Sequence, residues 1–190
     1  MNATTHAVFG VAALAGASLL AGNEPPLYAY PAAVVAAWIP DVDNPRSRLG
    51  NGLSRTKSPV LNAIMRPVSW ALRTTSFVLA RTVGHRTLTH SLFGVALFSA
   101  LVSPAAHFSP DLFFALVVGY ASHLVADALN VKGVQLLWPV GWPFRLLPRG
   151  IRSGGVVEFV VALAAAVAAG YGIYALHPAL ARMWFTPVIL

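Results

Sequence analysis

The chain has 190 residues, of which 57% are hydrophobic and only 10% are charged. Soluble domains carry about 25% charged residues, so the composition excludes an ordinary water-soluble fold and predicts one membrane-embedded domain over residues 1–190. The net charge of +7 is better explained by basic cytoplasmic loops than by nucleic-acid binding. The absence of cysteine excludes disulfides and thiolate metal ligands.

Five apolar segments approach the roughly 20 residues that span a bilayer. No basic residue precedes the first segment, which argues against a cleaved signal peptide. Pro31 interrupts the second segment, which either crosses fully or is partly re-entrant. The expected fold is all-α, a polytopic helical bundle of about five membrane-embedded helices. The predicted spans are residues 7–21, 27–39, 88–106, 112–129 and 156–176.

Residues 58–82 are predicted to form an amphipathic helix lying in the membrane interface. Ser58 is a suitable cap and Pro59 fits the first turn. Apolar and basic side chains then fall on opposite sides, as in interfacial helices. A loop helix packed on the domain is the alternative. The tryptophans of the loop 130–155 also suit the headgroup layer.

The distribution of basic residues predicts the orientation. With five spans, one side holds twelve of the thirteen Lys and Arg residues, and the other side holds only Arg182. Cytoplasmic loops of membrane proteins collect Lys and Arg. The N-terminus is therefore expected inside the cell and the C-terminus outside.

Ionisable residues are expected to gather at the cytoplasmic ends of the spans. His85 and His90 are about 140° apart on a helix, so His85 is expected to precede the helix that His90 begins. Ionisable groups in a bilayer are costly and normally pair or bind a ligand. One or two divalent ions, with zinc first and manganese or iron as alternatives, suit four imidazoles and four carboxylates. The candidate ligands are His6, Asp41, Asp43, His85, His90, His123, Asp127 and Glu158.

The spacing of these residues supports parts of the site. His123 and Asp127 are four residues apart and share one helix face. Asp41 and Asp43 point the same way in an extended chain, as a clamp for metal ions requires. Each motif alone has a simpler explanation: a hydrogen-bonded helical pair, acids in a turn, or, for Glu158, attraction to a helix N-terminus.

Four sequence patterns together point to a known family. They are Pro40-Asp41-Val42-Asp43 with Pro45, His85-Arg86 with Thr89-His90-Ser91, Ser122-His123 with Asp127, and Gly133-Val134 with Leu136-Leu137-Trp138-Pro139. With these the chain resembles the YdjM-type family of bacterial inner-membrane proteins, described as LexA-binding, metal-dependent hydrolases. The resemblance implies an inner-membrane location and metal-dependent hydrolysis.

A more distant resemblance is to zinc-dependent phospholipase C, which holds zinc with an early His, an Asp, a middle His and a His-x-x-x-Asp helix. That family's later His-x-x-x-Glu is not reproduced, because Gly154 stands four residues before Glu158. This departure argues against a third metal. The positions in compatible order are His6, Asp41, His90, His123 and Asp127.

The leading hypothesis is a hydrolase that acts at the cytoplasmic face on a phosphoester of a lipid-like substrate. Asp43 and Glu158 would be further ligands or supply a base, and Arg86 would neutralise an anionic substrate or simply anchor its span. One alternative is a metal or proton transporter, although transporters place such residues nearer the bilayer midplane. Another is a non-enzymatic membrane tether or regulator with a structural metal site, whose partner could be a transcriptional repressor.

Overall fold

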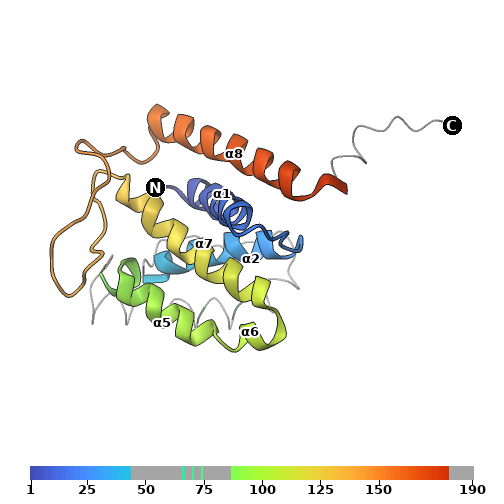
Figure 1. Ribbon diagram of the computed structural model, residues 1–190. Helices are drawn as coiled ribbons and strands as arrows, with labels where there is room; N and C mark the ends of the chain where they lie inside the picture. Colours follow the sequence, from blue (N-terminus) through green and yellow to red (C-terminus); the bar gives the residue numbers. More distant parts are fainter. Residues whose placement is uncertain (44–65, 67–69, 71–73, 75–86, 180–190) are drawn as a thin grey trace.

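The computed structural model describes residues 1–43, 66, 70, 74 and 87–179. Within these residues every named element is helical, and the loop 130–155 contains two isolated β-bridges. The predicted all-α class is therefore confirmed. The elements are α1 (Ala3–Ala21), α2 (Ala29–Trp38), η1 (Ile39–Asp43), η2 (Leu88–His90), α5 (Leu92–Val102), α6 (Ala105–Phe108), α7 (Pro110–Ala128) and α8 (Val156–Leu176) (Figure 1).

Short polar residues fix where the helices begin. Asn2 caps α1 by accepting a hydrogen bond from the amide of Thr5. Ser109 caps α7 in the same way, and Pro110 occupies the first turn, as its sequence predicts. Ser91 caps α5 and thereby separates it from the 3-10 turn that contains His90. The caps therefore decide where several candidate site residues lie along their helices.

Of the helices that the structure describes, three are long and apolar enough to cross a membrane: α1, α7 and α8. The count of five spans is not confirmed, because the other two apolar segments form shorter helices. After α2, Pro40 lies in the 3-10 turn η1 instead of continuing the α-helix. Helix α5 has 11 residues, and Pro104, which cannot donate a backbone hydrogen bond, follows its end.

Small residues allow α1, α2 and α7 to pack closely. A Cβ atom on Gly119 of α7 would lie 2.3 Å from the carbonyl oxygen of Ala33 in α2, and one on Gly10 of α1 would lie 2.9 Å from the same oxygen. Membrane helices commonly use such residues to bring their backbones together. This packing places the last turn of α2 against α1 and α7, which contribute candidate site residues.

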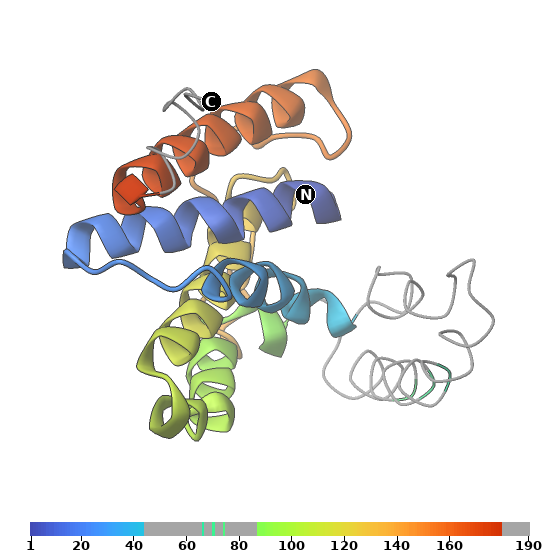
Figure 2. The ribbon, with the colours of Figure 1, turned by 90° about the vertical axis from the view of Figure 1, so that its right-hand side faces the viewer.

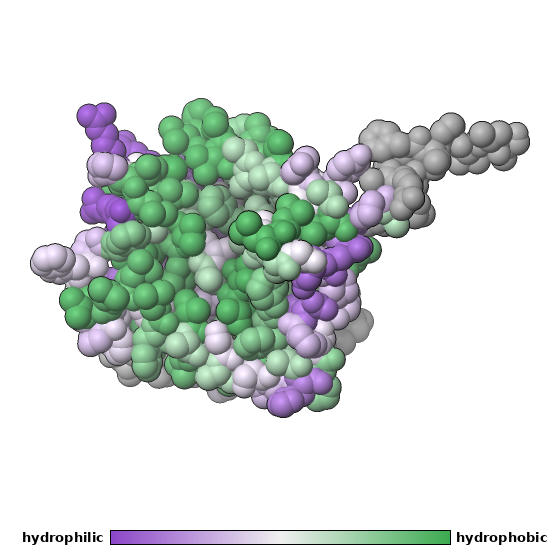
Figure 3. All heavy atoms as spheres, in the orientation of Figure 1, coloured by the Kyte–Doolittle hydropathy of each residue, from purple (hydrophilic) through white to green (hydrophobic). Residues whose placement is uncertain are grey.

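The outer surface of the bundle is apolar. Phe159, Leu163 and Val167 of α8 are each more than half exposed. A broad hydrophobic band crosses the face shown in Figure 3, and hydrophilic residues gather toward its left and right margins. Such an exposed band would be unstable in water and suits contact with lipid.

The predicted amphipathic helix over residues 58–82 falls almost entirely outside the described residues. Of this segment the structure describes Arg66, Trp70 and Thr74, each in helical conformation. The Thr74 hydroxyl donates a hydrogen bond to the carbonyl of Trp70. The placement of this helix in the interface stays a prediction.

Candidate metal centre

Five of the predicted site residues come together at one end of the bundle. They come from the first turn of α1, from η1, from η2 and from the last turns of α7, which lie toward the left of Figure 1; Figure 2 shows the start of α1 and η1 toward the same side. Four of them, His6, His90, His123 and Asp127, are completely buried, whereas the Asp41 side chain is 22% exposed. The five residues are His6, Asp41, His90, His123 and Asp127, and we call them the His–Asp cluster.

The centre of the His–Asp cluster is a pair of imidazole nitrogens. The Nε2 atoms of His90 and His123 are 3.1 Å apart. The Oδ1 atom of Asp41 lies 3.7 Å from the His90 nitrogen and 3.9 Å from the His123 nitrogen. The Oδ2 atom of Asp127 lies 3.8 Å from each of them. Two nitrogen and two oxygen atoms from three chain segments therefore point into one small volume.

A backbone carbonyl fixes the orientation of His123. Its Nδ1 atom is 2.7 Å from the carbonyl oxygen of Ala37 in the last turn of α2. Because a carbonyl can only accept, Nδ1 carries the proton, and Nε2 in the neutral ring presents its lone pair to the cluster. Metal-binding histidines are commonly oriented by a hydrogen bond of this kind.

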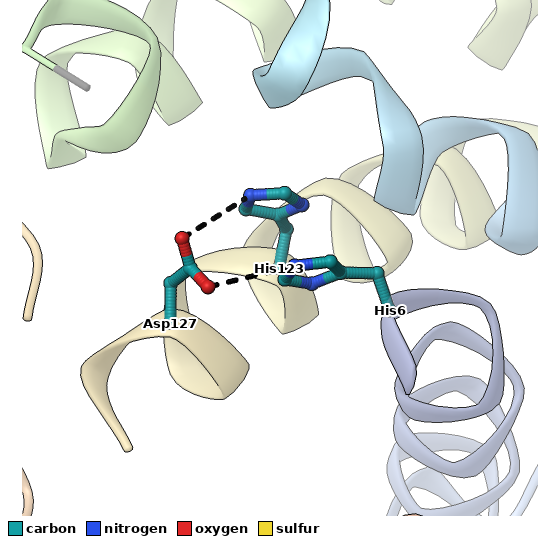
Figure 4. Close-up of side chains that lie close together, drawn as sticks. All are labelled: His6, His123 and Asp127. Atoms are coloured by element: carbon teal, nitrogen blue, oxygen red, sulfur yellow. Dashed lines mark ion pairs between the residues drawn. The ribbon is translucent and has the colours of Figure 1, made fainter. Parts of the chain in front are cut away.

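His6 lies near one carboxylate oxygen of Asp127, and His123 lies near the other. The His6 ring stacks on that of His123, with centroids 3.7 Å apart and planes 8° from parallel. Its Nε2 lies 3.5 Å from the Oδ1 atom of Asp127, which also lies 2.6 Å from the Met1 nitrogen. Asp127 thus directs one oxygen toward His6 and the other toward His123 (Figure 4).

The donor set suits a divalent cation. Neither ring nitrogen of His6 makes a hydrogen bond to a described residue, although the ring is fully buried, and such a group is costly without a partner. Two ligands on a tetrahedral zinc ion with bonds of about 2.0–2.1 Å would be about 3.3 Å apart, close to the separation of the two Nε2 atoms. Among the described residues, two sets of three have ligand atoms within 4.8 Å of one another: His6, His123 and Asp127, and Asp41, His90 and His123.

Asp41 has the ionisation state that a ligand needs. Burial alone would raise the pKa of its carboxyl group. The interaction with His90 and the neighbouring imidazoles outweighs burial and holds the pKa of Asp41 well below its ordinary value. The carboxylate is therefore charged at neutral pH and available to a cation.

The sequence of the chain matches the family described as "YdjM inner membrane protein" over residues 1–189. The chain belongs to this family. The resemblance seen in the sequence motifs is thereby confirmed. The family and the apolar helices together support an inner-membrane location.

Similar proteins occur in several bacteria. "Inner membrane protein YdjM" of Escherichia coli (strain K12) and that of Shigella flexneri are each 35% identical over 138 residues, covering 70% of this chain. The match spans 61% of those relatives, less than two thirds of their length. "Uncharacterized protein YvsG" of Bacillus subtilis (strain 168) is 32% identical over 178 residues, which are 93% of this chain and 96% of the relative. No solved structure matches.

In this YdjM-family protein Glu158 lies apart from the candidate metal ligands. It is buried at the start of α8 but belongs to neither set of candidate ligands. One of its oxygens accepts hydrogen bonds from the Asn2 amide at 2.6 Å and the Thr5 hydroxyl at 2.8 Å. The other accepts a short hydrogen bond from the amide of Gly154. Glu158 therefore fastens the first turn of α1, which carries His6, to α8.

The structure does not place the side chains of the remaining predicted site residues, His85, Arg86 and Asp43. Residues 44–65 and 75–86 are not described, so the structure does not place His85 or Arg86. The backbone of Asp43 belongs to η1, but its side chain lies outside the described part.

Sequence reasoning missed two supporting contacts in this YdjM-family protein. One is the Ala37 carbonyl that orients His123, and a backbone acceptor leaves no signature in a sequence. The other is the indole of Trp38, which donates a hydrogen bond at 2.7 Å to the carbonyl of Ala3 and holds α2 against α1. A tryptophan at the end of an apolar segment was the one signal in the sequence for it.

Replacing Glu158 separates positioning from metal binding. The Glu158→Gln substitution replaces one acceptor oxygen of a buried side chain with an NH2 group that faces a donor, so we expect a loss of about 1–3 kcal/mol in the free energy of unfolding. Bound metal per chain should stay close to the wild-type value. Thermal unfolding and elemental analysis of the same detergent-solubilised samples measure both quantities. Loss of metal with unchanged unfolding would mean that Glu158 is itself a ligand.

Proposed function

We propose that this protein is a membrane-embedded, metal-dependent hydrolase that acts at the cytoplasmic face on a phosphoester of a lipid-like substrate. One observation carries the proposal: two imidazole nitrogens 3.1 Å apart, with a carboxylate oxygen from each of two other positions within 4 Å of both. Burying such groups at the ends of membrane helices is costly, and a bound cation offsets this cost.

The His–Asp cluster divides into ligands and a supporting residue. His90, His123, Asp41 and Asp127 would hold the first ion. His6 would act through the second oxygen of Asp127 or complete a second position with it. A divalent cation, with zinc first and manganese or iron as alternatives, would activate water and polarise a phosphoryl group. The partial exposure of Asp41 marks the side from which a substrate could approach.

The charge of the surrounding surface supports the orientation and the substrate class. The loop 130–155, at the same end as the His–Asp cluster, exposes Lys132, Arg145, Arg149 and Arg152. Basic loops are typical of the cytoplasmic side, which supports an N-terminus inside the cell. Cationic side chains also attract phosphate, and we assign the same role to Arg86, two residues before η2.

The same loop favours a substrate that comes from the membrane. Its Trp142 is 85% exposed and its Leu137 is 65% exposed. Tryptophan and other apolar side chains beside basic ones are typical of a surface in the headgroup layer. A phosphoester on a phospholipid or a polyprenyl lipid would meet the His–Asp cluster at this depth.

Metal analysis tests the first step. Wild-type protein purified without a chelator should contain bound transition metal, and we predict that His123→Ala and Asp127→Ala each lower the affinity about tenfold or more, because changes even to outer partners of ligands cost about 10–100-fold. His107→Ala is the matched control, since His107 is exposed on α6 at the other end of the bundle. Metal-free wild-type protein, or equal loss in the control, would contradict the site.

Turnover tests the second step. We expect the metal-loaded protein in vesicles containing phosphatidic acid, phosphatidylglycerol and undecaprenyl diphosphate to release a water-soluble phosphate product from at least one of them. Chelation and His123→Ala should abolish the release, whereas His107→Ala should leave it unchanged. If metal binds but no product forms, the hydrolase proposal fails. Metal flux into the vesicles would then indicate a transporter, and a loss of stability alone would indicate a structural site.

A further inference from the structure

An apolar cavity of about 280 Å³ lies beside the His–Asp cluster, between α5, α7 and the loop 130–155. Its walls include Leu92 and Val95 of α5, Leu124 and Ala128 of α7, and Leu136 and Phe144 of the loop. Every described residue that lines the cavity is hydrophobic. A ligand in this cavity would therefore be held by apolar contact alone.

Several residues that line this cavity are neighbours of the candidate ligands in the sequence. Leu124 directly follows His123, and Ala128 directly follows Asp127. On the opposite wall, Leu92 lies two residues after His90. The amide of Leu92 donates a hydrogen bond at 2.9 Å to the carbonyl of Leu136, which fastens the loop over this wall. The cavity and the His–Asp cluster therefore share their supporting turns.

The mouth of the cavity opens onto the apolar outer surface. Leu92 is 54% exposed, Val125 is 51% exposed and Leu146 is 50% exposed, and all three line the cavity. In the membrane these side chains belong to the surface that lipid covers. A water-soluble ligand would find no polar partner here, whereas a hydrocarbon chain can enter from the bilayer without crossing water.

A second groove makes a poorer candidate. It lies between α1 and α8, has a volume of about 410 Å³, and has Asn2, Thr5 and Glu158 at its polar end. The Glu158 carboxylate already accepts three hydrogen bonds from the chain itself. This groove therefore offers a headgroup little that is not already used.

We propose that the cavity between α5, α7 and the loop 130–155 binds the hydrocarbon chain of a membrane lipid whose polar headgroup reaches the His–Asp cluster. The assignment of the headgroup rests on the proposed function, while the binding of the chain stands on the cavity itself. Burial of an alkyl chain would supply binding energy remote from the reacting group and would fix the headgroup in position. It would also favour lipid phosphoesters over soluble ones.

Photolabelling tests this site directly. The full-length protein is reconstituted in phosphatidylglycerol vesicles that contain a small fraction of phosphatidylglycerol with a diazirine midway along one acyl chain. After illumination, mass spectrometry maps the labelled peptides. We expect the strongest labelling on the walls of the cavity, and we expect it to approach saturation as the fraction of the diazirine lipid is raised.

Two matched substitutions make the experiment specific. Val125→Phe narrows the mouth and should reduce labelling of the cavity several-fold. Val160→Phe is the control, because Val160 is 55% exposed on α8 and lines no part of this cavity, so its labelling should match the wild type. Ala121→Phe fills the interior and should act like Val125→Phe. Even labelling of all exposed apolar residues, or equal labelling in Val125→Phe and Val160→Phe, would overturn the proposal.

The outcome is separable from the proposed hydrolysis. In His123→Ala the metal and the turnover should be lost, while labelling of the cavity should persist. If the wild type labels the cavity but binds no metal, the hydrolase proposal fails and the lipid site stands. If the wild type binds metal and turns over lipid but does not label the cavity, the lipid site fails alone.

Discussion

The hydrogen bond between the His123 ring and the Ala37 carbonyl is the interaction on which the candidate site depends. It joins α7 to α2 at the depth where α1, η1 and η2 also deliver polar side chains. It sets the proton on Nδ1 and so leaves Nε2 to face His90, Asp41 and Asp127. The close approach of Gly119 to Ala33 one turn earlier makes this contact geometrically accessible. Small residues in the middle of the bundle therefore determine the chemistry at its end.

Much of the fold could be predicted from the sequence because hydrophobicity and capping are local properties. Span five coincides with α8, and the Ser109-Pro110 signal marks the start of α7. The lengths of α2 and α5 could not be predicted in the same way. Their ends depend on Pro40 and Pro104, and on whether the chain continues as α-helix or as a tighter turn, which hydrophobic composition does not distinguish.

The candidate site was predictable to the extent that it depends on topology. Once the spans alternate, His6, His90 and His123 must reach the same end of the bundle. The pairing of oxygens and nitrogens was not predictable, because it depends on side-chain directions after packing. Glu158 illustrates this limit: its position at the helix start was correct, but the residues at the start of α1 take up one of its oxygens and the amide of Gly154 takes up the other.

X-ray absorption spectroscopy at the metal edge of the purified wild-type protein tests the central claim most directly. The account predicts a shell of nitrogen and oxygen ligands at about 2.0–2.2 Å, with the multiple scattering of at least two imidazole rings and no sulfur. His90 and His123 would supply those rings. A metal surrounded by water oxygens without imidazole, or the absence of any bound metal, would contradict the account.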